Sequence, residues 1–178
     1  MNDQLIGFYR GTSPDRAGRT IDQIWAWTDS ELELVHDYIQ WLFPSAKPSQ
    51  FNAKAPLLDE ETVRAFRNDS ELRARLLRSL ERMLSFYGLE LRLSAGCPPC
   101  ISKAGNYSER RANWQEAPAG QLNHNLLRLT RILEALTVLG LEEYSAALCA
   151  CLETIQSEEP DSIPEKTLSF WRQAATPR

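Results

Sequence analysis

The chain has 178 residues, a length that fits one domain with a single hydrophobic core. Its formal net charge of −4 and its pI of about 5.3 argue against a general affinity for nucleic acid or acidic membranes. No apolar run approaches the roughly 20 residues of a membrane span, and the N-terminal segment lacks the features of a secretory signal. We therefore expect a cytoplasmic protein whose four cysteines are free thiols.

Helical periodicity dominates the sequence, and the alternation typical of β-strands is nearly absent. The first helix is expected to begin at a capping box, formed by Thr28 and Glu31, and to end at Pro44. We predict an all-α fold in a single domain, residues 1–178, with a long loop over residues 89–121. Its helices, about six, are expected near residues 29–43, 59–66, 70–87, 123–139, 141–155 and 163–174.

The segment HDYIQWLFP, residues 36–44, falls in the first of these helices. On a helical projection most of its side chains lie on a broad apolar arc, which predicts a core position. His36 and Gln40 lie one turn apart at the edge of that arc. They are expected either to orient a ligand or to bond buried backbone groups of a neighbouring loop.

The helix over residues 122–139 carries a second group of polar side chains. His124, Arg128 and Arg131 share one face, where the guanidinium groups can bind a carboxylate or phosphate or form structural ion pairs. Asn125 falls within the apolar arc near the helix start. It is expected to bond a loop backbone, such as the stretch around Asn113-Trp114.

Cys97-Pro-Pro-Cys100 has the spacing of a redox pair or of half a zinc site. A zinc site needs two further ligands, and Cys149 and Cys151 are a poor second pair because positions i and i+2 of a helix point apart. His36 and His124 are conceivable ligands, but no spacing requires them. Metal or redox chemistry is thus the minor alternative here.

Several segments in a fixed order resemble the conserved region of the opioid growth factor receptor family. HDYIQWLFP is followed by an Asn and an Ala-Pro-Leu, and FYRG…GRTIDQIWAW precedes it, as in bacterial members. Later segments continue the resemblance, which covers roughly residues 8–152. These segments are RLLRSLERMLSFYGL (75–89), Asn106-Tyr107, Asn113-Trp114 and HNLLRLTRILEALTVLGL (124–141).

The resemblance implies a receptor-like binding role. The founding vertebrate protein of the family is described as a receptor for the peptide met-enkephalin, linked to the nucleus and to restraint of cell growth. Its long C-terminal repeat region has no counterpart in this sequence, which indicates a short, bacterial member with the helix over 163–174 appended. The family supplies no catalytic residues to transfer to this chain.

From the residues and the resemblance together we expect a binding or interaction module rather than an enzyme, without metal or cofactor. Its ligand is expected to be a peptide, a protein or a small anion, bound where the His36 helix meets the His124 helix under the 89–121 loop. Alanine at His124 and Arg128 is expected to weaken binding with little change in melting temperature. The alternative is a metal- or cofactor-dependent enzyme that uses His36, His124 and the Cys97/Cys100 pair. The expected contact residues are His36, Gln40, Trp114, His124, Asn125, Arg128 and Arg131.

Overall fold

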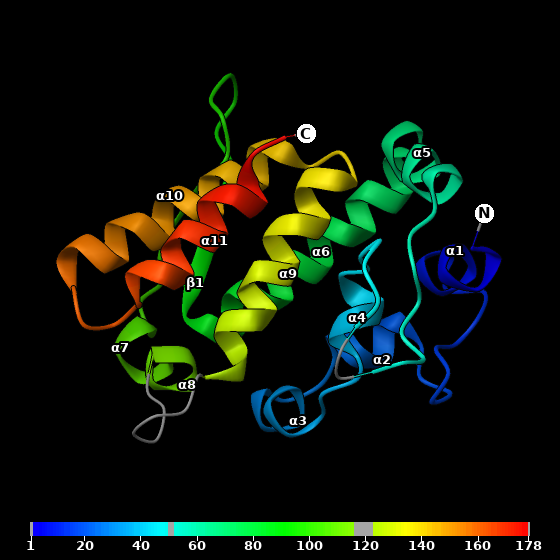
Figure 1. The fold of residues 1–178 in the computed structure, drawn as a ribbon, viewed down its shortest axis with the longest axis horizontal. Helices are drawn as coiled ribbons and strands as arrows, with labels where there is room; N and C mark the ends of the chain where they lie inside the picture. The colour runs from blue at the N-terminus through cyan, green and yellow to red at the C-terminus, as the bar shows by residue number, and fades with distance from the viewer. Residues whose placement is uncertain (1, 50–51, 116–122, 178) are drawn as a thin grey trace. The chain divides into compact units, whose positions relative to one another are not determined.

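A computed structural model describes residues 2–49, 52–115 and 123–177, and it confirms that the chain is predominantly helical (Figure 1). The chain divides into two compact units, Met1–Arg82 and Met83–Arg178, which are described separately below. The organisation as a single domain therefore stays a prediction. Among the described residues, no helix combines the length and the hydrophobicity needed to span a lipid bilayer, and the cytoplasmic location stays a prediction too.

The first unit is built from short helices and the greater part of one long helix. Aromatic side chains form its core: the ring of Tyr9 lies against Phe66 at 4.7 Å between centroids, and that of Phe8 lies against Trp41 at 5.3 Å. The elements are α1 (Asp3–Arg10), α2 (Ile21–Trp25), α3 (Asp29–Leu34), α4 (Ile39–Leu42), α5 (Glu60–Asn68) and α6 (Ser70–Tyr87).

The continuous helix predicted over residues 29–43 is wrong. Its capping box at Thr28 forms as expected, but the helix ends at Leu34 and Val35 is extended, with φ −90° and ψ 133°. One local contact and one contact from the segment before α2 stabilise this break. The Tyr38 hydroxyl donates to the Leu32 carbonyl at 3.2 Å, and Asp37 accepts a bond of 2.8 Å from Arg19. Tertiary contacts therefore outweigh the helical periodicity at residues 35–38.

Long-range hydrogen bonds attach the N-terminal helices to α6. The Trp25 indole donates to the Ser79 hydroxyl at 3.0 Å, and Arg82 bonds both the Trp27 carbonyl and the Asp29 carboxylate at 2.7 and 2.8 Å. At the other end of the unit, the Asn2 backbone N–H donates to the Thr62 hydroxyl at 2.8 Å. The start of α1 is thus joined directly to α5.

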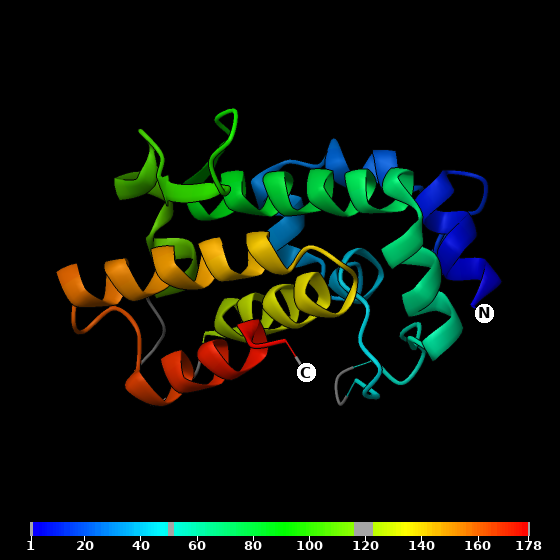
Figure 2. The ribbon, with the colours of Figure 1, turned by 90° about the horizontal axis from the view of Figure 1, so that it is seen from above.

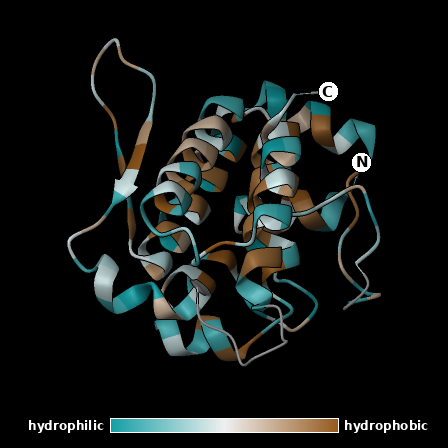
Figure 3. Cartoon of the chain, turned by 60° about the vertical axis from the view of Figure 1, so that its left-hand side comes forward, coloured by the Kyte–Doolittle hydropathy of each residue, from teal (hydrophilic) through white to brown (hydrophobic). Residues whose placement is uncertain are grey.

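The second unit holds three long helices, α9, α10 and α11, that pack on one another (Figure 2). Their apolar sides face inward, as the hydropathy colouring shows (Figure 3). Between them the buried Thr137 hydroxyl lies 2.9 Å from the Ser145 hydroxyl and 3.0 Å from the Ala174 carbonyl. The elements are β1 (Leu89–Arg92), β2 (Cys100–Lys103), α7 (Tyr107–Arg110), α8 (Ala112–Gln115), α9 (His124–Val138), α10 (Glu142–Glu158) and α11 (Glu165–Ala175).

The segment over residues 89–121 is not a structureless loop, and the fold is not strictly all-α. Its first part forms an antiparallel hairpin in which Leu89 pairs with Lys103 and Arg92 with Cys100. Each strand has four residues, too few for the alternation to be recognised in the sequence. Two four-residue helices, α7 and α8, follow it, so the description as about six helices is too simple.

Candidate functional site

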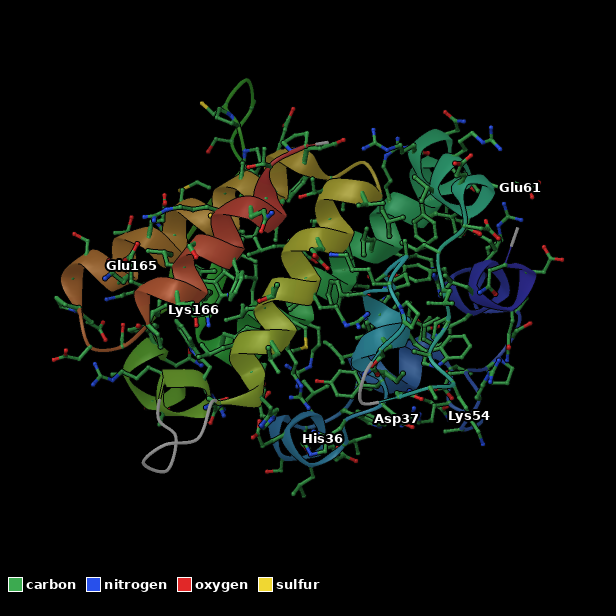
Figure 4. All side chains as sticks on the ribbon, viewed as in Figure 1. His36, Asp37, Lys54, Glu61, Glu165 and Lys166 are labelled. Carbon is green, nitrogen blue, oxygen red and sulfur yellow. The ribbon has the colours of Figure 1, made fainter. Side chains whose placement is uncertain are left out.

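His36 lies outside any helix, in the short segment between α3 and α4, and its side chain is exposed. Asp37 is its neighbour on the same segment (Figure 4). Because the helix is broken here, His36 and Gln40 do not share the one-turn spacing that the sequence indicated. His36 lies at the surface of the first unit.

Gln40 on α4 is only 5% exposed, although its side chain is polar. Its amide oxygen, Oε1, is buried and accepts no hydrogen bond in the described structure. A buried polar atom without a partner costs about 1–3 kcal/mol, and such atoms are rare in folded proteins. Gln40 Oε1 is thus a buried hydrogen-bond acceptor without a donor in the described structure.

In the second unit, a network of amides fixes the start of α9. Asn125 is fully buried, and its Nδ2 donates to the Asn113 carbonyl at 2.7 Å. Asn123 donates to the same carbonyl at 3.2 Å, and Arg128 Nη1 donates to Asn125 Oδ1 at 3.0 Å. The predicted bond from Asn125 to the loop backbone near Trp114 is confirmed.

The polar face of α9 is largely removed from water. Arg128 is 5% exposed, while His124 and Arg131 are half-buried. Burial lowers the pKa of Arg131, an effect that the charge of Glu134 partly offsets. Because Arg128 is buried and bonded to Asn125, alanine at this position is now expected to lower the stability of the fold, contrary to the expectation from the sequence.

Trp114 is a core residue. It is fully buried on α8, and its indole N–H donates to the Tyr87 carbonyl at 3.1 Å. Its ring lies edge-on to those of Tyr87 and Tyr107, at 6.1 and 6.5 Å between centroids. Trp114 thus positions the chain before α9 and does not present a surface for a ligand. The expectation that the His36 and His124 segments form one site stays a prediction, since the two segments belong to different units.

The CxxC motif lies on the projecting hairpin, with both thiols exposed. Cys97 lies at a bend after the turn of the hairpin, where its backbone N–H donates to the Ser94 carbonyl at 3.1 Å. Cys100 begins strand β2. The redox or half-zinc role of this pair stays a prediction.

The other two cysteines are buried on α10. Burial raises the pKa of Cys149, and it raises that of Cys151 to about 12. Among the described residues, no group of three or more His, Cys, Asp or Glu side chains lies close enough to hold a metal ion. The alternative of a metal- or cofactor-dependent enzyme stays a prediction.

Ion pairs fasten the base of the hairpin to the end of α10. Lys103 Nζ lies 2.7 Å from Glu158 Oε2 and 2.6 Å from Glu159 Oε1, and Arg111 lies 2.9 Å from Glu159. Burial on its own would raise the pKa of Glu159, but hydrogen bonds and charges from Lys103 and Arg111 lower it overall. The folded state therefore favours the ionised form of this carboxyl group.

Acid is expected to weaken this attachment. A carboxyl group whose pKa is lowered on folding contributes stability above its unfolded pKa, near 4.3, and the contribution is lost as the pH falls through the folded value. Glu159→Gln is expected to lower the free energy of unfolding by about 0.5–1 kcal/mol at pH 6 and to have little effect at pH 3. Urea unfolding at both pH values measures this. Glu158→Gln, at a more exposed partner of Lys103, is the control and should change less; an equal loss at both pH values would contradict the prediction.

Sequence reasoning missed a buried charge cluster in the first unit. The Asp15 side chain is fully buried. Its Oδ1 accepts from the backbone N–H groups of Ala17 and Arg19 at 2.9 Å each, and its Oδ2 accepts from Arg19 Nε at 2.7 Å. Arg19 also bonds Asp37 and lies 5.4 Å from the Trp27 ring centroid. The signal in the sequence was an Asp placed four residues before an Arg, with the turn-forming Gly18 between them.

Comparison with known proteins places these features in a family. The profile of the opioid growth factor receptor conserved region matches residues 6–177, a range that includes α11. The chain is similar to the human opioid growth factor receptor, with 38% identity over 152 residues, covering 82% of the chain and 21% of that protein. It is also similar to the mouse opioid growth factor receptor-like protein 1, with 34% identity over 174 residues, covering 93% of the chain and 35% of that protein.

The chain thus spans about a fifth to a third of the length of these curated relatives. A bacterial origin, expected from the sequence, stays a prediction. No solved structure matches the fold. The order of the motifs, the helical architecture and the match over residues 6–177 lead to one conclusion: the chain belongs to the opioid growth factor receptor conserved-region family.

Proposed function

We propose that this chain is a binding module of the peptide-receptor type rather than an enzyme. The observation that carries the proposal is the buried amide oxygen of Gln40, which accepts no hydrogen bond in the described structure. A peptide carries backbone N–H groups along its length and an ammonium group at its N-terminus. Either kind of group can donate a hydrogen bond to Gln40 Oε1. Binding would thus recover the free energy that the unpaired atom costs.

The polar face of α9 supports the same proposal from the second unit. His124, Asn125, Arg128 and Arg131 lie within two turns of helix, and two of them are buried. Guanidinium groups held partly out of water interact strongly with a carboxylate or another small anion. A peptide carries such a group at its C-terminus. His36, exposed in the first unit, is a further proposed contact, and Trp114 is a positioning residue.

The names of the relatives indicate an opioid growth factor as the first peptide to test. Met-enkephalin, the peptide that the resemblance implies, is therefore titrated into the protein in a calorimeter. Gln40→Leu is expected to weaken binding at least tenfold, about 1.4 kcal/mol, while thermal stability stays equal or rises because an unpaired polar atom is removed. Gln173→Leu, at an exposed position of α11, is the matched control and should leave binding unchanged.

Two outcomes would contradict the proposal. If the wild-type protein binds met-enkephalin with a dissociation constant above about 1 mM, this peptide is not its ligand. If Gln40→Leu lowers the melting temperature and leaves binding of the peptide intact, the amide of Gln40 has a structural role. Arg131→Gln, at a half-buried position, tests the α9 face and should weaken binding of the free acid more than binding of the C-terminal amide of the peptide.

A further inference from the structure

Two arginines of α6 lie over one tryptophan of α2 in the first unit. The guanidinium carbon of Arg78 is 4.2 Å from the centroid of the Trp25 ring, and that of Arg75 is 5.2 Å from it. The ring is itself fixed, because its indole N–H donates to the Ser79 hydroxyl at 3.0 Å and this hydroxyl donates to the Arg75 carbonyl at 3.1 Å. Trp25 therefore holds both guanidinium groups through cation–π contacts, which use none of their N–H donors.

Most of these donors are unused. A guanidinium group has five N–H donors. Within the described residues Arg78 has an ion pair of 3.8 Å with Asp22, too long for a hydrogen bond, and its side chain is 62% exposed. Arg75 Nη2 donates to Asp22 at 3.2 Å, while the buried Nε of Arg75 has no acceptor in this part of the chain. The pair is thus held in place with donors to spare.

The Asp22 carboxylate marks a point that both arginines reach. Its Oδ2 lies 3.2 Å from Arg75 Nη2, and its Oδ1 lies 3.8 Å from Arg78 Nη1. One negative charge is shared between two positive charges, and the Asp22 side chain is 56% exposed. Exposed ion pairs of this kind are weak. Residue 11 beside them is glycine, where a Cβ would lie 3.2 Å from Arg75 Nη2. An anion from solution therefore has access to the place that the carboxylate occupies.

We propose that Arg75 and Arg78 form a binding site for a phosphate monoester, which displaces the Asp22 carboxylate from between them. At pH 7 such a group has a charge of about −1.5 to −2 and three acceptor oxygens. It therefore compensates two guanidinium groups, which a single carboxylate does not. Arginine binds phosphate through parallel N–H groups, and Trp25 orients the arginines before the ligand arrives. The site uses α2 and α6, so it does not depend on the proposed role of Gln40 on α4.

The first test titrates phenyl phosphate into the full chain at pH 8 and constant ionic strength. NMR follows the Nε–H signals of Arg75 and Arg78 and the indole N–H signal of Trp25. All three are expected to shift, with a dissociation constant of about 1 mM or below. Benzoate, which carries a carboxylate on the same ring, should bind about tenfold more weakly. Equal binding of the two compounds, or signals that do not move, would overturn the proposal.

Inorganic phosphate is the second arm of this titration. It should bind about as tightly as phenyl phosphate, because the proposed contacts are all to phosphoryl oxygens. If inorganic phosphate binds tenfold more tightly than the ester, the site is one for free phosphate and the proposal of a monoester is wrong.

Asp22→Asn tests the displacement. The amide keeps the shape of the side chain but removes the competing charge, so phenyl phosphate is expected to bind about threefold to tenfold more tightly. Glu60→Gln, at an exposed position of α5, changes the net charge equally and is the matched control. Its affinity should equal that of the wild type. Unchanged or weaker binding by Asp22→Asn would show that no carboxylate is displaced.

Arg78→Gln tests the site from the other side. The Trp25 signal should then report binding about tenfold weaker than in the wild type, with the melting temperature unchanged because the replaced side chain is mostly exposed. Arg64→Gln, at an exposed position of α5, is the control for the loss of one positive charge. If the two variants bind phenyl phosphate equally well, the general charge of the surface attracts the anion and the proposed site does not exist.

Discussion

Replacing Asp15 by alanine is expected to lower the free energy of unfolding by about 3–5 kcal/mol. The substitution removes three hydrogen bonds, to Ala17 N, Arg19 N and Arg19 Nε, from a side chain that is fully buried. It also leaves the guanidinium group of Arg19, 18% exposed, without its buried partner. For a domain of this size the loss corresponds to a decrease in melting temperature of roughly 10 °C, which calorimetry measures directly.

Asp37→Ala is the matched control for this prediction. Asp37 binds the same guanidinium group at 2.8 Å, but its side chain is 51% exposed. Solvent-exposed ion pairs contribute about 0–1 kcal/mol, so this variant should be nearly as stable as the wild type. Similar losses for both variants would mean that Arg19, and not the buried carboxylate, stabilises the loop before α2.

Asn125→Leu is expected to destabilise the second unit by about 2–4 kcal/mol. Asn125 connects the chain before α9 to α9 itself, since its Nδ2 donates to the Asn113 carbonyl and its Oδ1 accepts from Arg128. Leucine has a similar volume but can do neither. The guanidinium group of Arg128, 5% exposed, then loses an acceptor in a place where water cannot replace it.

A double-mutant cycle separates this bond from ordinary packing. When Arg128→Met is combined with Asn125→Leu, the donor and the acceptor are removed together. The loss in the double variant should be at least about 1 kcal/mol smaller than the sum of the two single losses. Urea unfolding of the four proteins measures the coupling. Additive losses would show that Asn125 and Arg128 stabilise the fold independently.

Features that depend on neighbouring residues were predictable from the sequence. The capping box of Thr28 and the end of α6 before Gly88 follow from local chemistry, and both are present. The break after Leu34 was not predictable, because it depends on a bond to Arg19 from the turn before α2. The hairpin was missed because Ile101 and Leu89, its buried residues, are too few to show a period.

The residues of the candidate site show the same difference between features set by local sequence and features set by distant contacts. A polar residue inside an apolar arc needs a partner, and this reasoning led correctly to the bond between Asn125 and the Asn113 carbonyl. His36 was expected at the edge of a helix and lies between α3 and α4 instead, because tertiary contacts interrupt the helix there. No pattern could show that Gln40 Oε1 would lack a donor, since an unpaired atom is a property of the complete fold.

The bonds that join the ends of the first unit have a consequence for its synthesis. Asn2 bonds Thr62, and Trp25 bonds Ser79, so neither contact can form while the later residue is still inside the ribosome. Short helices such as α4, with four residues and no side-chain cap, are unstable in isolation. The nascent N-terminal segment therefore emerges with its aromatic residues uncovered, and they stay exposed until α6 has left the exit tunnel.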